Sequence, residues 1–412
     1  MNKLPDGWKI KKLKDICTIQ DGIHKTPKYT SKGIKFVSVE NINDLYNSNK
    51  FISEEDYNKM YKIKAKKNDI FMTRIGDIGT PAILNKDEKL AYYVTLCLFT
   101  NIDEEVFNKY LYYAIQSNYF KKELYHRTLH VAFPKKINLG DIGDCKFILP
   151  LLDEQKRIAS ALSKIDAYLE NTIKLIEEKE RFKRGIAKKL LTCKEGENIP
   201  EARFKGFEDE WEIVKLGDIG TITATGVDKK INDNETPIKL LNYLDVFNRN
   251  KLYEKEISYM TTATEKQLEK CNIRKGDLFI TPSSEDKKGI AKSSVAMEDF
   301  KNTVYSYHII RVRFNKEIDL KFKSYMCDTD FFHRQAYRLC GGSGQRYFIK
   351  LDNFRNMEIC IPKSIEEQEK IGGYLSLLDA EIDNLKKQKE LIKEMKRGAM
   401  QKLLSGEIRL LE

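Results

Sequence analysis

The sequence predicts an α+β protein with an internal pseudo-two-fold repeat, in which two similar domains of mixed α/β structure are separated by two long antiparallel coiled-coil helices. Three observations lead to this prediction. Motifs of the first half recur in the second half in the same order, two stretches carry long heptad patterns, and the remaining segments alternate short strand and helix patterns.

The start and the end of each half carry the clearest copies. At the start, an offset of 203 residues (211 − 8) relates two sets, which are Trp8, Leu13, Asp15 and Ile16, and Trp211, Leu216, Asp218 and Ile219. Further along, an offset of 213 residues (367 − 154) relates Glu154, Gln155, Asp166 and Gly185 to Glu367, Gln368, Asp379 and Gly398. Because the two offsets are so close, both halves follow one plan, a globular segment and then a long helix.

Each globular segment is expected to mix strands with helices. Strands are predicted at residues 34–39, 69–73, 238–241 and 277–281, and helices at 108–125 and 321–338. Both segments close with an apolar strand that ends in a proline, at Pro150 and Pro362. Proline cannot continue a strand ladder, so each one is expected to lead into a long helix. The charged stretch 192–207 reads as a linker.

Two heptad seams predict the long helices, because their apolar positions alternate steps of four and three residues. The seam residues are Ile158, Leu162, Ile165, Leu169 and Ile176 in the first helix, and Ile371, Leu375, Leu378, Ile382 and Leu385 in the second. Lysines interrupt both seams at matched positions, Lys183 and Lys396. An isolated helix would expose its apolar stripe to water, so we expect the seams to pack on each other.

The repeat predicts an antiparallel helix pair that acts as a ruler between the domains. The 38 residues from Glu154 to Leu191 span roughly 57 Å at about 1.5 Å per residue. Ordinary dimerisation or scaffold helices are the alternative interpretation. The chain then divides into a first domain (1–152), a first long helix (153–192), a linker with the second domain (193–365), and a second long helix with a C-terminal tail (366–412).

The composition favours a polyanionic partner. The 412 residues are 41% hydrophobic, and 73 Lys and Arg against 62 Asp and Glu give a net charge of +11, which attracts phosphate groups. Duplex DNA matches a protein with two similar halves. No apolar stretch approaches the roughly 18 residues of a membrane span, and we expect a cytoplasmic protein with no membrane partner. The eight scattered cysteines and five histidines have no zinc-ligand spacing, so no metal site is predicted.

Several motifs in fixed order resemble a known family. They are Ile-Pro-Glu-Ala-Arg-Phe-Lys-Gly-Phe at 199–207, Lys-Leu-Gly-Asp-Ile at 215–219, Lys-Gly-Asp-Leu-Phe-Ile at 275–280, Gly-Gly-Ser-Gly-Gln at 341–345, and Ile-Pro at 361–362 followed by Glu-Gln at 367–368. This pattern closely resembles the target-recognition domains of type I restriction-modification specificity subunits, over essentially the whole chain. The first half lacks the glycine of 275–280 and has Leu-His-Val-Ala-Phe at 129–133 in place of the glycine-rich loop, so the halves are expected to read different sequences.

The resemblance implies a non-catalytic subunit. In this family each target-recognition domain reads one half of a split, gapped DNA site, and the helices fix the gap. The partners it implies are double-stranded DNA, two methylation subunits that form an adenine methyltransferase, and restriction subunits that supply a motor and a nuclease. This chain would bind no cofactor. S-adenosylmethionine would belong to the methylation subunits, and ATP and magnesium to the restriction subunits.

Two other function classes are alternatives, an enzyme and an interaction scaffold. A self-contained methylase would need an Asn/Asp-Pro-Pro-Tyr/Phe motif, and none of the nine prolines is followed by another; a motor ATPase would need a phosphate-binding Gly-Lys-Ser/Thr loop, which is missing. Asp277, Glu285 and Lys287 follow the residue order of metal-dependent nucleases, but Asp69 in the other half has no such companions. A coiled-coil scaffold for protein or RNA is the third possibility.

Base readout is expected from loops that bring donors and acceptors to the major groove, with other basic groups on phosphates. In the second domain the candidates are Gln345, Arg346 and Tyr347 on the glycine-rich loop, and Ser283, Lys287 and Lys288 after a strand. In the first domain they are His24, Lys25, Lys28, Tyr29, Arg74, Arg127, His130, Lys135 and Lys136. The alternative for each is an ordinary solvent-facing side chain.

Overall fold

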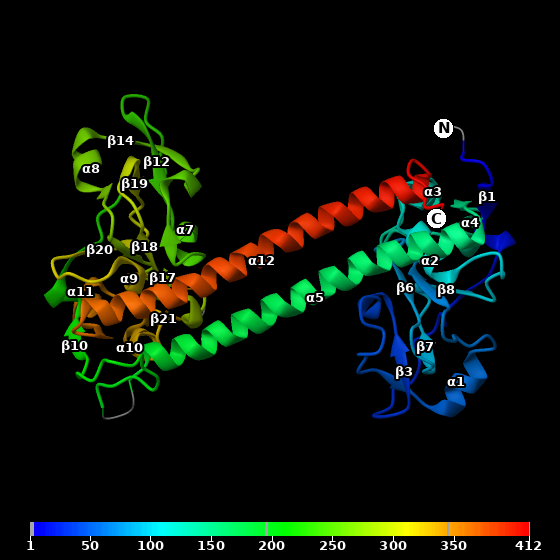
Figure 1. Cartoon of the computed structure of the whole chain (residues 1–412), viewed down its shortest axis with the longest axis horizontal. Coiled ribbons are helices and arrows are strands. Elements are labelled where there is room, and N and C mark those ends of the chain that lie inside the picture. The colour runs from blue at the N-terminus through cyan, green and yellow to red at the C-terminus, as the bar shows by residue number, and fades with distance from the viewer. Residues whose placement is uncertain (1–3, 194–196, 344–345, 412) are drawn as a thin grey trace. The chain divides into compact units, whose positions relative to one another are not determined.

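The computed structural model describes residues 4–193, 197–343 and 346–411, apart from the side chains of Lys288 and Ser343. The chain forms two compact units, unit 1 (Met1–Ile173 with Lys387–Glu412) and unit 2 (Lys174–Lys386). Each unit holds one globular domain and part of both long helices, α5 (Leu152–Leu191) and α12 (Ile365–Ser405), which are drawn in Figure 1. The predicted fold class is therefore confirmed.

Three sheets form the strand framework of unit 1. An antiparallel sheet has the order β2-β8-β5-β6, a second sheet has the order β4-β3-β7 with β3 and β7 parallel, and β1 pairs with β9. The strands are β1 (Lys9–Lys12), β2 (Thr18–Asp21), β3 (Ile34–Val37), β4 (Phe51–Ile52), β5 (Ile70–Thr73), β6 (Pro81–Ile83), β7 (Leu90–Tyr92), β8 (Leu96–Thr100) and β9 (Lys146–Leu149).

Unit 2 repeats this framework with additions. The order β11-β20-β16-β18 matches the first sheet of unit 1, and β13 is added at its end. The order β14-β12-β19 matches the second sheet, and β15 is added. Strand β10 pairs with β23, as β1 pairs with β9. The strands are β10 (Glu212–Lys215), β11 (Gly220–Thr223), β12 (Thr236–Leu241), β13 (Lys251–Leu252), β14 (Met260–Ala263), β15 (Asn272–Ile273), β16 (Leu278–Ile280), β17 (Ser283–Ser284), β18 (Ser293–Ala296), β19 (Phe300–Tyr305), β20 (Ile310–Phe314), β21 (Gly341–Ser343), β22 (Arg346–Phe348) and β23 (Glu358–Ile361).

The short helices correct one prediction in each half. Residues 108–125 and 321–338 were each expected to form one helix, and each forms two. A hydroxyl side chain starts the second helix in both cases, since Ser117 accepts from the Phe120 amide and Thr329 from the Phe332 amide. The helices are α1 (Glu54–Met60), α2 (Asn108–Ile115), α3 (Asn118–Arg127), α4 (Leu139–Gly143), α6 (Leu216–Ile219), α7 (Tyr243–Phe247), α8 (Glu265–Lys270), α9 (Leu320–Met326), α10 (Asp330–Leu339) and α11 (Leu351–Asn356).

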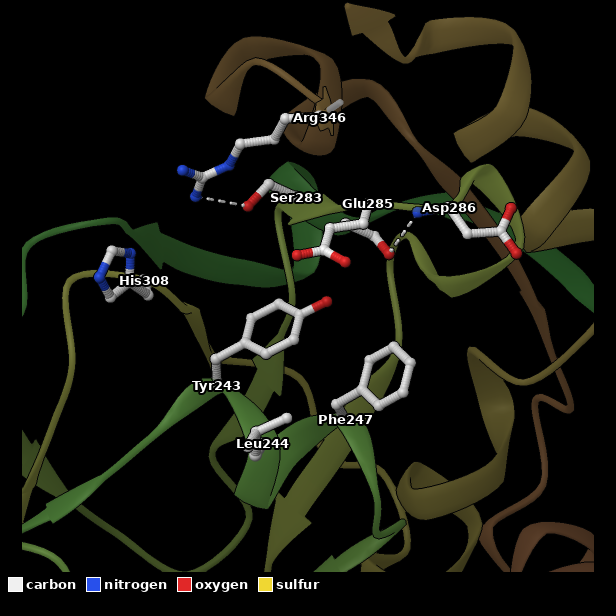
Figure 2. Close-up of a pocket in the computed structure, with 9 residues that line it drawn as sticks. Tyr243, Leu244, Phe247, Ser283, Glu285, Asp286, His308 and Arg346 are labelled. Atoms are coloured by element: carbon white, nitrogen blue, oxygen red, sulfur yellow. Dashed lines mark hydrogen bonds between the residues drawn. The ribbon is translucent and has the colours of Figure 1, made fainter. Parts of the chain in front are cut away.

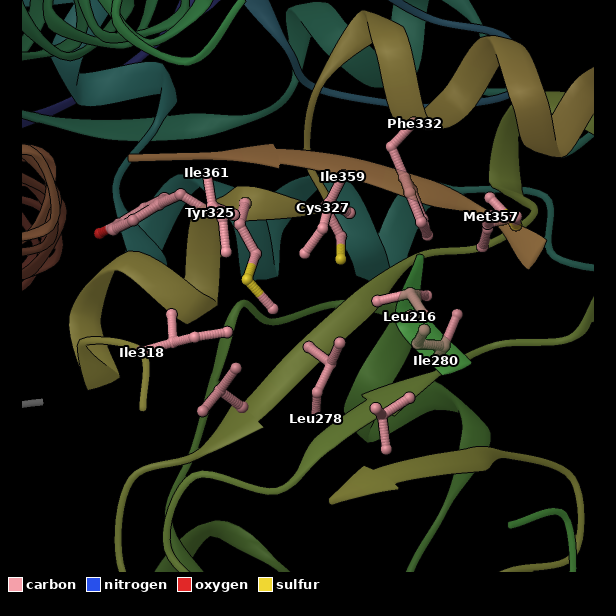
Figure 3. Packing of buried hydrophobic residues seen from close by; sticks show 14 of the residues in the cluster. Leu216, Leu278, Ile280, Ile318, Tyr325, Cys327, Phe332, Met357, Ile359 and Ile361 are labelled. Atoms are coloured by element: carbon pink, nitrogen blue, oxygen red, sulfur yellow. The ribbon is translucent and has the colours of Figure 1, made fainter. Parts of the chain in front are cut away.

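Central strands of each domain are apolar on both faces because they separate two cores. Side chains of a strand alternate between its faces. Leu278 and Ile280 of β16 therefore enter the core that contacts α9 and α10, which Figure 3 shows, while Phe279 enters the core on the other face. Strand β5 divides the first domain in the same way. This explains why the strand predictions rested on continuous apolar runs.

Matched glycines stand at the same place in each domain, just after the first strand of the larger sheet. A Cβ atom on Gly22 would lie 2.2 Å from the carbonyl oxygen of Tyr92, and one on Gly226 would lie 2.3 Å from the backbone of Ser306. Only glycine allows so close an approach of two backbones. The residues that follow form parallel bridges in both domains, Ile23 with Tyr93 and Val227 with Ser306.

The lysines that interrupt the helix seams pair with aspartates on the other helix. In unit 1, Lys396 of α12 lies 2.6 Å from Asp166 of α5, which also accepts from the Tyr113 hydroxyl. In unit 2, Lys183 of α5 pairs with Asp379 of α12. As residue numbers rise along α5, those of the α12 partners fall in each unit, so the predicted antiparallel packing is confirmed. Of the predicted seam residues, Ile165, Leu169 and Leu385 are half-buried and the other seven are buried.

A buried glutamate at the start of each long helix receives an arginine that follows the other long helix. Arg409, after α12, donates to both oxygens of Glu154 over 3.1 and 2.7 Å, and Trp8 Nε1 donates to the same carboxylate. Arg203, after α5, donates to both oxygens of Glu367 over 2.8 Å. Residues 192–207 were expected to be a linker, and in the described part of this segment Arg203 bonds to Glu367 at the start of α12.

Candidate nucleic-acid interface

The glycine-rich loop of the second domain belongs to a small sheet. Strand β22 pairs with β21 on one side and with β17 on the other, and β17 follows the buried strand β16. Arg346 donates from Nη2 to the Ser283 hydroxyl over 3.0 Å. The Lys287 ammonium lies 5.3 Å from the centre of the Tyr347 ring. Two groups of candidates that are distant in sequence thus form one surface.

A pocket of about 600 Å³ opens beside this surface. Figure 2 shows Arg346 on one side of it, the rings of Tyr243 and Phe247 on the opposite side, and Glu285 between them. The two rings stack with their centroids 5.6 Å apart, and His308 forms a further part of the wall. The pocket therefore offers hydrogen-bond donors, a carboxylate and an aromatic face to one ligand group.

Charge and burial set the protonation of the pocket walls. Burial, together with the nearby cations Lys229 and Arg346, lowers the pKa of His308 and favours its neutral imidazole at pH 7. Burial raises the pKa of Tyr243, so its phenol remains a neutral hydrogen-bond donor. Arg346 is exposed and permanently charged, which makes it the strongest donor of this wall.

The second-domain candidates differ in accessibility. Arg346 and Lys287 are exposed, Tyr347 is half-buried, and Ser283 is buried beneath the Arg346 guanidinium. Gln345 and the side chain of Lys288 lie outside the described residues.

Four first-domain candidates share the segment between β2 and β3. His24, Lys25, Lys28 and Tyr29 are all exposed there. The His24 ring nitrogen Nε2 lies 2.8 Å from Asp21 Oδ2. Within the part of the chain that the structure describes, neither Lys25 nor Lys28 has a carboxylate at ion-pair distance. These two lysines are therefore available to phosphate groups.

Arg74 lies inside the first domain and connects its candidate loops. Its side chain is 9% exposed. The guanidinium donates to the backbone carbonyls of Ile137 and Val94, each over 3.1 Å, and Nη1 lies 3.4 Å from Asp21 Oδ2. Asp21 in turn contacts His24. Arg74 thus joins the segment that carries His24 to the loop that ends at Ile137, and in this position it does not face solvent.

The remaining first-domain candidates surround the loop formed by residues 129–136. His130 Nε2 donates to the Tyr125 carbonyl over 2.9 Å, while Arg127 pairs with Glu123 over 3.0 Å. Lys135 and Lys136 are exposed and, among the described residues, have no carboxylate at ion-pair distance. This loop therefore presents two free cations.

Both domains build the candidate surface from the same parts. A segment that follows the second of the two short helices, α3 or α10, pairs with the segment that follows a buried central strand. In the first domain the bridge joins Lys136 to Ile75, and in the second Phe348 pairs with Ser283. The sequence separated these segments by about sixty residues in each half. The structure brings them together.

Tyr243, Phe247 and His308 line the pocket and are not among the residues predicted from the sequence. Tyr243 and Phe247 stand four residues apart in α7, which begins just after β12, so both face one side of the helix. An aromatic pair at this spacing directly after a strand was the available signal. His308 is half-buried and also lines the pocket.

The nuclease-like residues do not come together. Both carboxylate oxygens of the buried Asp277 accept from Arg313, over 2.8 and 2.6 Å, whereas Glu285 and Lys287 are exposed on the next loop. Among the residues described, no group of three or more His, Cys, Asp or Glu side chains is placed to hold a metal ion. A search of the described helices finds none with the length and hydropathy needed to span a membrane.

Solved structures of similar architecture exist. The crystal structure of a type I restriction-modification S subunit from M. genitalium superposes with a TM-score of 0.57 at 16% identity, covering 98% of this chain and 97% of that chain. A chain solved in work on complex assembly and conformational transition of the type I R-M system gives a TM-score of 0.60 at 14% identity, covering 99% of this chain and 100% of that one. These similarities establish the shared fold.

Sequence comparison establishes the family. The model of the type I restriction modification DNA specificity domain matches twice, at residues 5–178 and 208–394. The type I restriction enzyme MjaVIII specificity subunit of Methanocaldococcus jannaschii is 25% identical over 376 residues, which cover 89% of this chain and 86% of that protein. The putative MjaX specificity subunit of the same organism is 26% identical over 437 residues, covering 100% and 96%. The chain therefore belongs to the type I restriction-modification specificity family, and it carries the DNA specificity domain of that family twice.

Proposed function

We propose that the two candidate surfaces read the two halves of the split DNA site. The second domain uses the β21–β22 hairpin, the loop after β16 and the adjoining pocket, and the first domain uses residues 22–33 and 129–136. The observation that carries this proposal is the repeated architecture, in which loops distant in sequence are hydrogen-bonded into one surface in each domain. Loops held on a rigid sheet can present side chains to base edges in a fixed geometry.

The chemistry of the second surface fits a G·C pair. Arg346 carries a fork of donors that matches O6 and N7 of guanine, and Ser283 orients this fork through one nitrogen. Glu285, between Arg346 and the aromatic wall, can accept from N4 of cytosine. Exposed lysines such as Lys287 hold phosphates and fix the register.

We further propose that the helices set the unread gap. Each helix is anchored to a domain at its first turn by a buried carboxylate, Glu154 in α5 and Glu367 in α12. The ion pairs of the seam, Lys396 with Asp166 and Lys183 with Asp379, fix the register of the two helices within each unit. With both ends fixed, the number of helical residues determines how far apart two half-sites can lie.

The helices also offer docking surfaces for two methylation subunits. In unit 1 the large apolar side chains Tyr168, Leu391 and Met395 of the helix pair are exposed, and in unit 2 so are Leu175, Phe182 and Leu377. Exposed apolar side chains on the helices of both units suit two copies of one partner, each bringing its own S-adenosylmethionine. Restriction subunits, with ATP and magnesium, would complete the assembly. Since its substrate would be chromosomal DNA, the complex would act in the cytoplasm.

Single-molecule methylome sequencing tests this function. Cells that express the methylation subunit with the wild-type chain are compared with cells that lack the chain. We expect one split, gapped adenine-methylation motif to vanish when the chain is removed. An unchanged methylome, with the methylation subunit shown to be active, would contradict the proposal.

Two variants of the same experiment test the second-domain surface. Arg346→Ala removes the proposed base contact, and we expect relaxed sequence in one half of the motif while the other half stays intact, since one bidentate contact supplies about 1–3 kcal/mol of discrimination. Arg355→Ala is the matched control, because Arg355 is exposed in α11 and pairs with Asp352. Equal effects of both variants would remove Arg346 from base readout.

A further inference from the structure

Two apolar side chains stand fully exposed at the tip of the loop 129–136 in the first domain. Val131 is 99% and Phe133 103% exposed, and the next most exposed large hydrophobic side chain of the described residues, Ile231, reaches 69%. Burying such side chains is favourable, so a loop that keeps both in water gives up that stabilisation. Two neighbouring exposures of this size indicate a contact with a partner.

The base of the loop is fixed by backbone hydrogen bonds. The Leu129 amide donates to the Lys136 carbonyl over 2.8 Å, and the Gly76 amide donates to the Lys135 carbonyl over 2.8 Å. Beyond the loop, Arg74 holds the Ile137 carbonyl. The tip is therefore presented from a closed and anchored base.

The charge beside the tip selects the kind of partner. Lys135 and Lys136 follow Phe133 after a single proline, and both are exposed cations without a carboxylate partner among the described residues. A lipid surface or a protein could also receive an apolar tip. The loop, however, occupies the same place in its domain as the β21–β22 hairpin does in the other, after the second short helix and bridged to the segment that follows a buried strand. This position and these cations point to duplex DNA.

We propose that Val131 and Phe133 form an apolar base-reading site that packs against the methyl group of a thymine in the major groove, while Lys135 and Lys136 hold the flanking phosphates. Apolar contact with the C5 methyl is the direct way to recognise thymine there. A half-site that carries an adenine for methylation also carries a thymine on the opposite strand. The inference rests on the proposed function. It assigns the first domain an apolar readout, in contrast to the polar readout around Arg346.

Removal of single thymine methyl groups tests the site in the assembled complex of this chain with its methylation subunits. Each thymine of the mapped site is replaced in turn by deoxyuridine, which lacks only the methyl. For the wild type we expect about four-fold weaker binding at one position of the first half-site, the loss that corresponds to about 0.8 kcal/mol for one buried methyl-sized group. For Phe133→Ser we expect weaker binding to the normal site and no further loss with deoxyuridine.

Three variants complete the test. Val131→Ser should reduce the deoxyuridine effect as Phe133→Ser does, and Ile231→Ser, which removes an exposed apolar side chain from the second domain, should leave it unchanged. Lys135→Ala should weaken binding to all DNA sequences alike. It should also reduce, by about one, the slope of the logarithm of the binding constant against the logarithm of the salt concentration. Because all four side chains are exposed, thermal unfolding of the variants should match that of the wild type.

The outcomes that overturn the inference are distinct from failure of the proposed function. No deoxyuridine effect in the first half-site, or an equal effect in wild type and Phe133→Ser, would exclude a methyl contact by this loop. Impaired assembly with the methylation subunits, with normal DNA binding once assembled, would make the tip a protein-docking surface. An unchanged methylome on removing the wild-type chain would instead contradict the proposed function, and methylome sequencing reports that outcome separately.

Discussion

Replacing Arg203 by alanine probes the anchor that joins the segment after α5 to the start of α12. The Glu367 side chain is 2% exposed and that of Arg203 is 13% exposed, and two hydrogen bonds of 2.8 Å join them. Arg203 also donates to the Asp209 carbonyl over 2.7 Å. Arg203→Ala therefore leaves a buried carboxylate without its cation. Loss of one partner from a buried pair costs about 3–5 kcal/mol, and we expect a loss of that size in the free energy of unfolding of unit 2.

Urea denaturation followed by tryptophan fluorescence measures this loss. The chain has two tryptophans, Trp8 and Trp211, and Trp211 is buried in unit 2. In a Trp8→Phe background the fluorescence reports unit 2 by itself. The matched control is Lys205→Ala, because Lys205 is exposed in the same segment. The control should change stability by less than about 0.5 kcal/mol.

A double-mutant cycle separates the ion pair from other effects. Glu367→Gln removes the buried charge, so Arg203→Ala should cost much less in that background than in the wild type. An Arg203→Ala loss no larger than that of Lys205→Ala, or an equal loss in the Glu367→Gln background and the wild type, would refute the anchoring argument.

Three further predictions concern the helices. Burial acts to raise the pKa of Glu154, but the hydrogen bonds from Arg409 and Trp8 outweigh it, and the pKa is lowered. The ionised carboxylate therefore stabilises unit 1 at pH values above the ordinary glutamate pKa. This contribution is lost as the pH falls through the lowered pKa. When the melting temperature is measured as a function of pH, the Glu154→Gln variant should lack this acid-dependent loss of stability. Asp379→Asn should destabilise unit 2 by about 1–3 kcal/mol in the urea assay, because the half-buried Lys183 loses its counter-charge. One heptad inserted near Thr172 of α5 and matched in α12 adds about 10.5 Å of helix. Methylome sequencing should then find a gap that is longer by about three base pairs, or no methylation. Full activity at the original gap would show that the helices do not set the gap length.

The long helices were predictable because their signal is local and repeated. Apolar residues at heptad spacing identify a helix face, and the matched Lys183 and Lys396 showed that both seams keep one register. What the seam lysines contact was not predictable, since Asp379 and Asp166 lie about two hundred residues away in the chain. The breaks at Ser117 and Thr329 were missed because the apolar period continues through them. A hydroxyl residue at the start of a helix turn was the available signal.

The candidate surfaces were predictable in composition and not in geometry. Sequence position placed Arg74 after a strand, where a base contact is plausible. Its burial depends on Asp21, Val94 and Ile137, which come from three separate segments. Arg346 was identified from its glycine-rich neighbourhood, whereas its bond to Ser283 required the pairing of β17 with β22. Long-range strand pairing of this kind has no local sequence signal.

Exchange of the first domain tests the central claim most directly. Residues 1–150 are replaced by those of a relative with a different recognition site, and the methylome of cells expressing the chimera is sequenced. Independent reading by the two domains predicts that one half of the motif changes to that of the relative, while the other half and the gap stay as they were. A change in both halves, or in neither, would contradict the account.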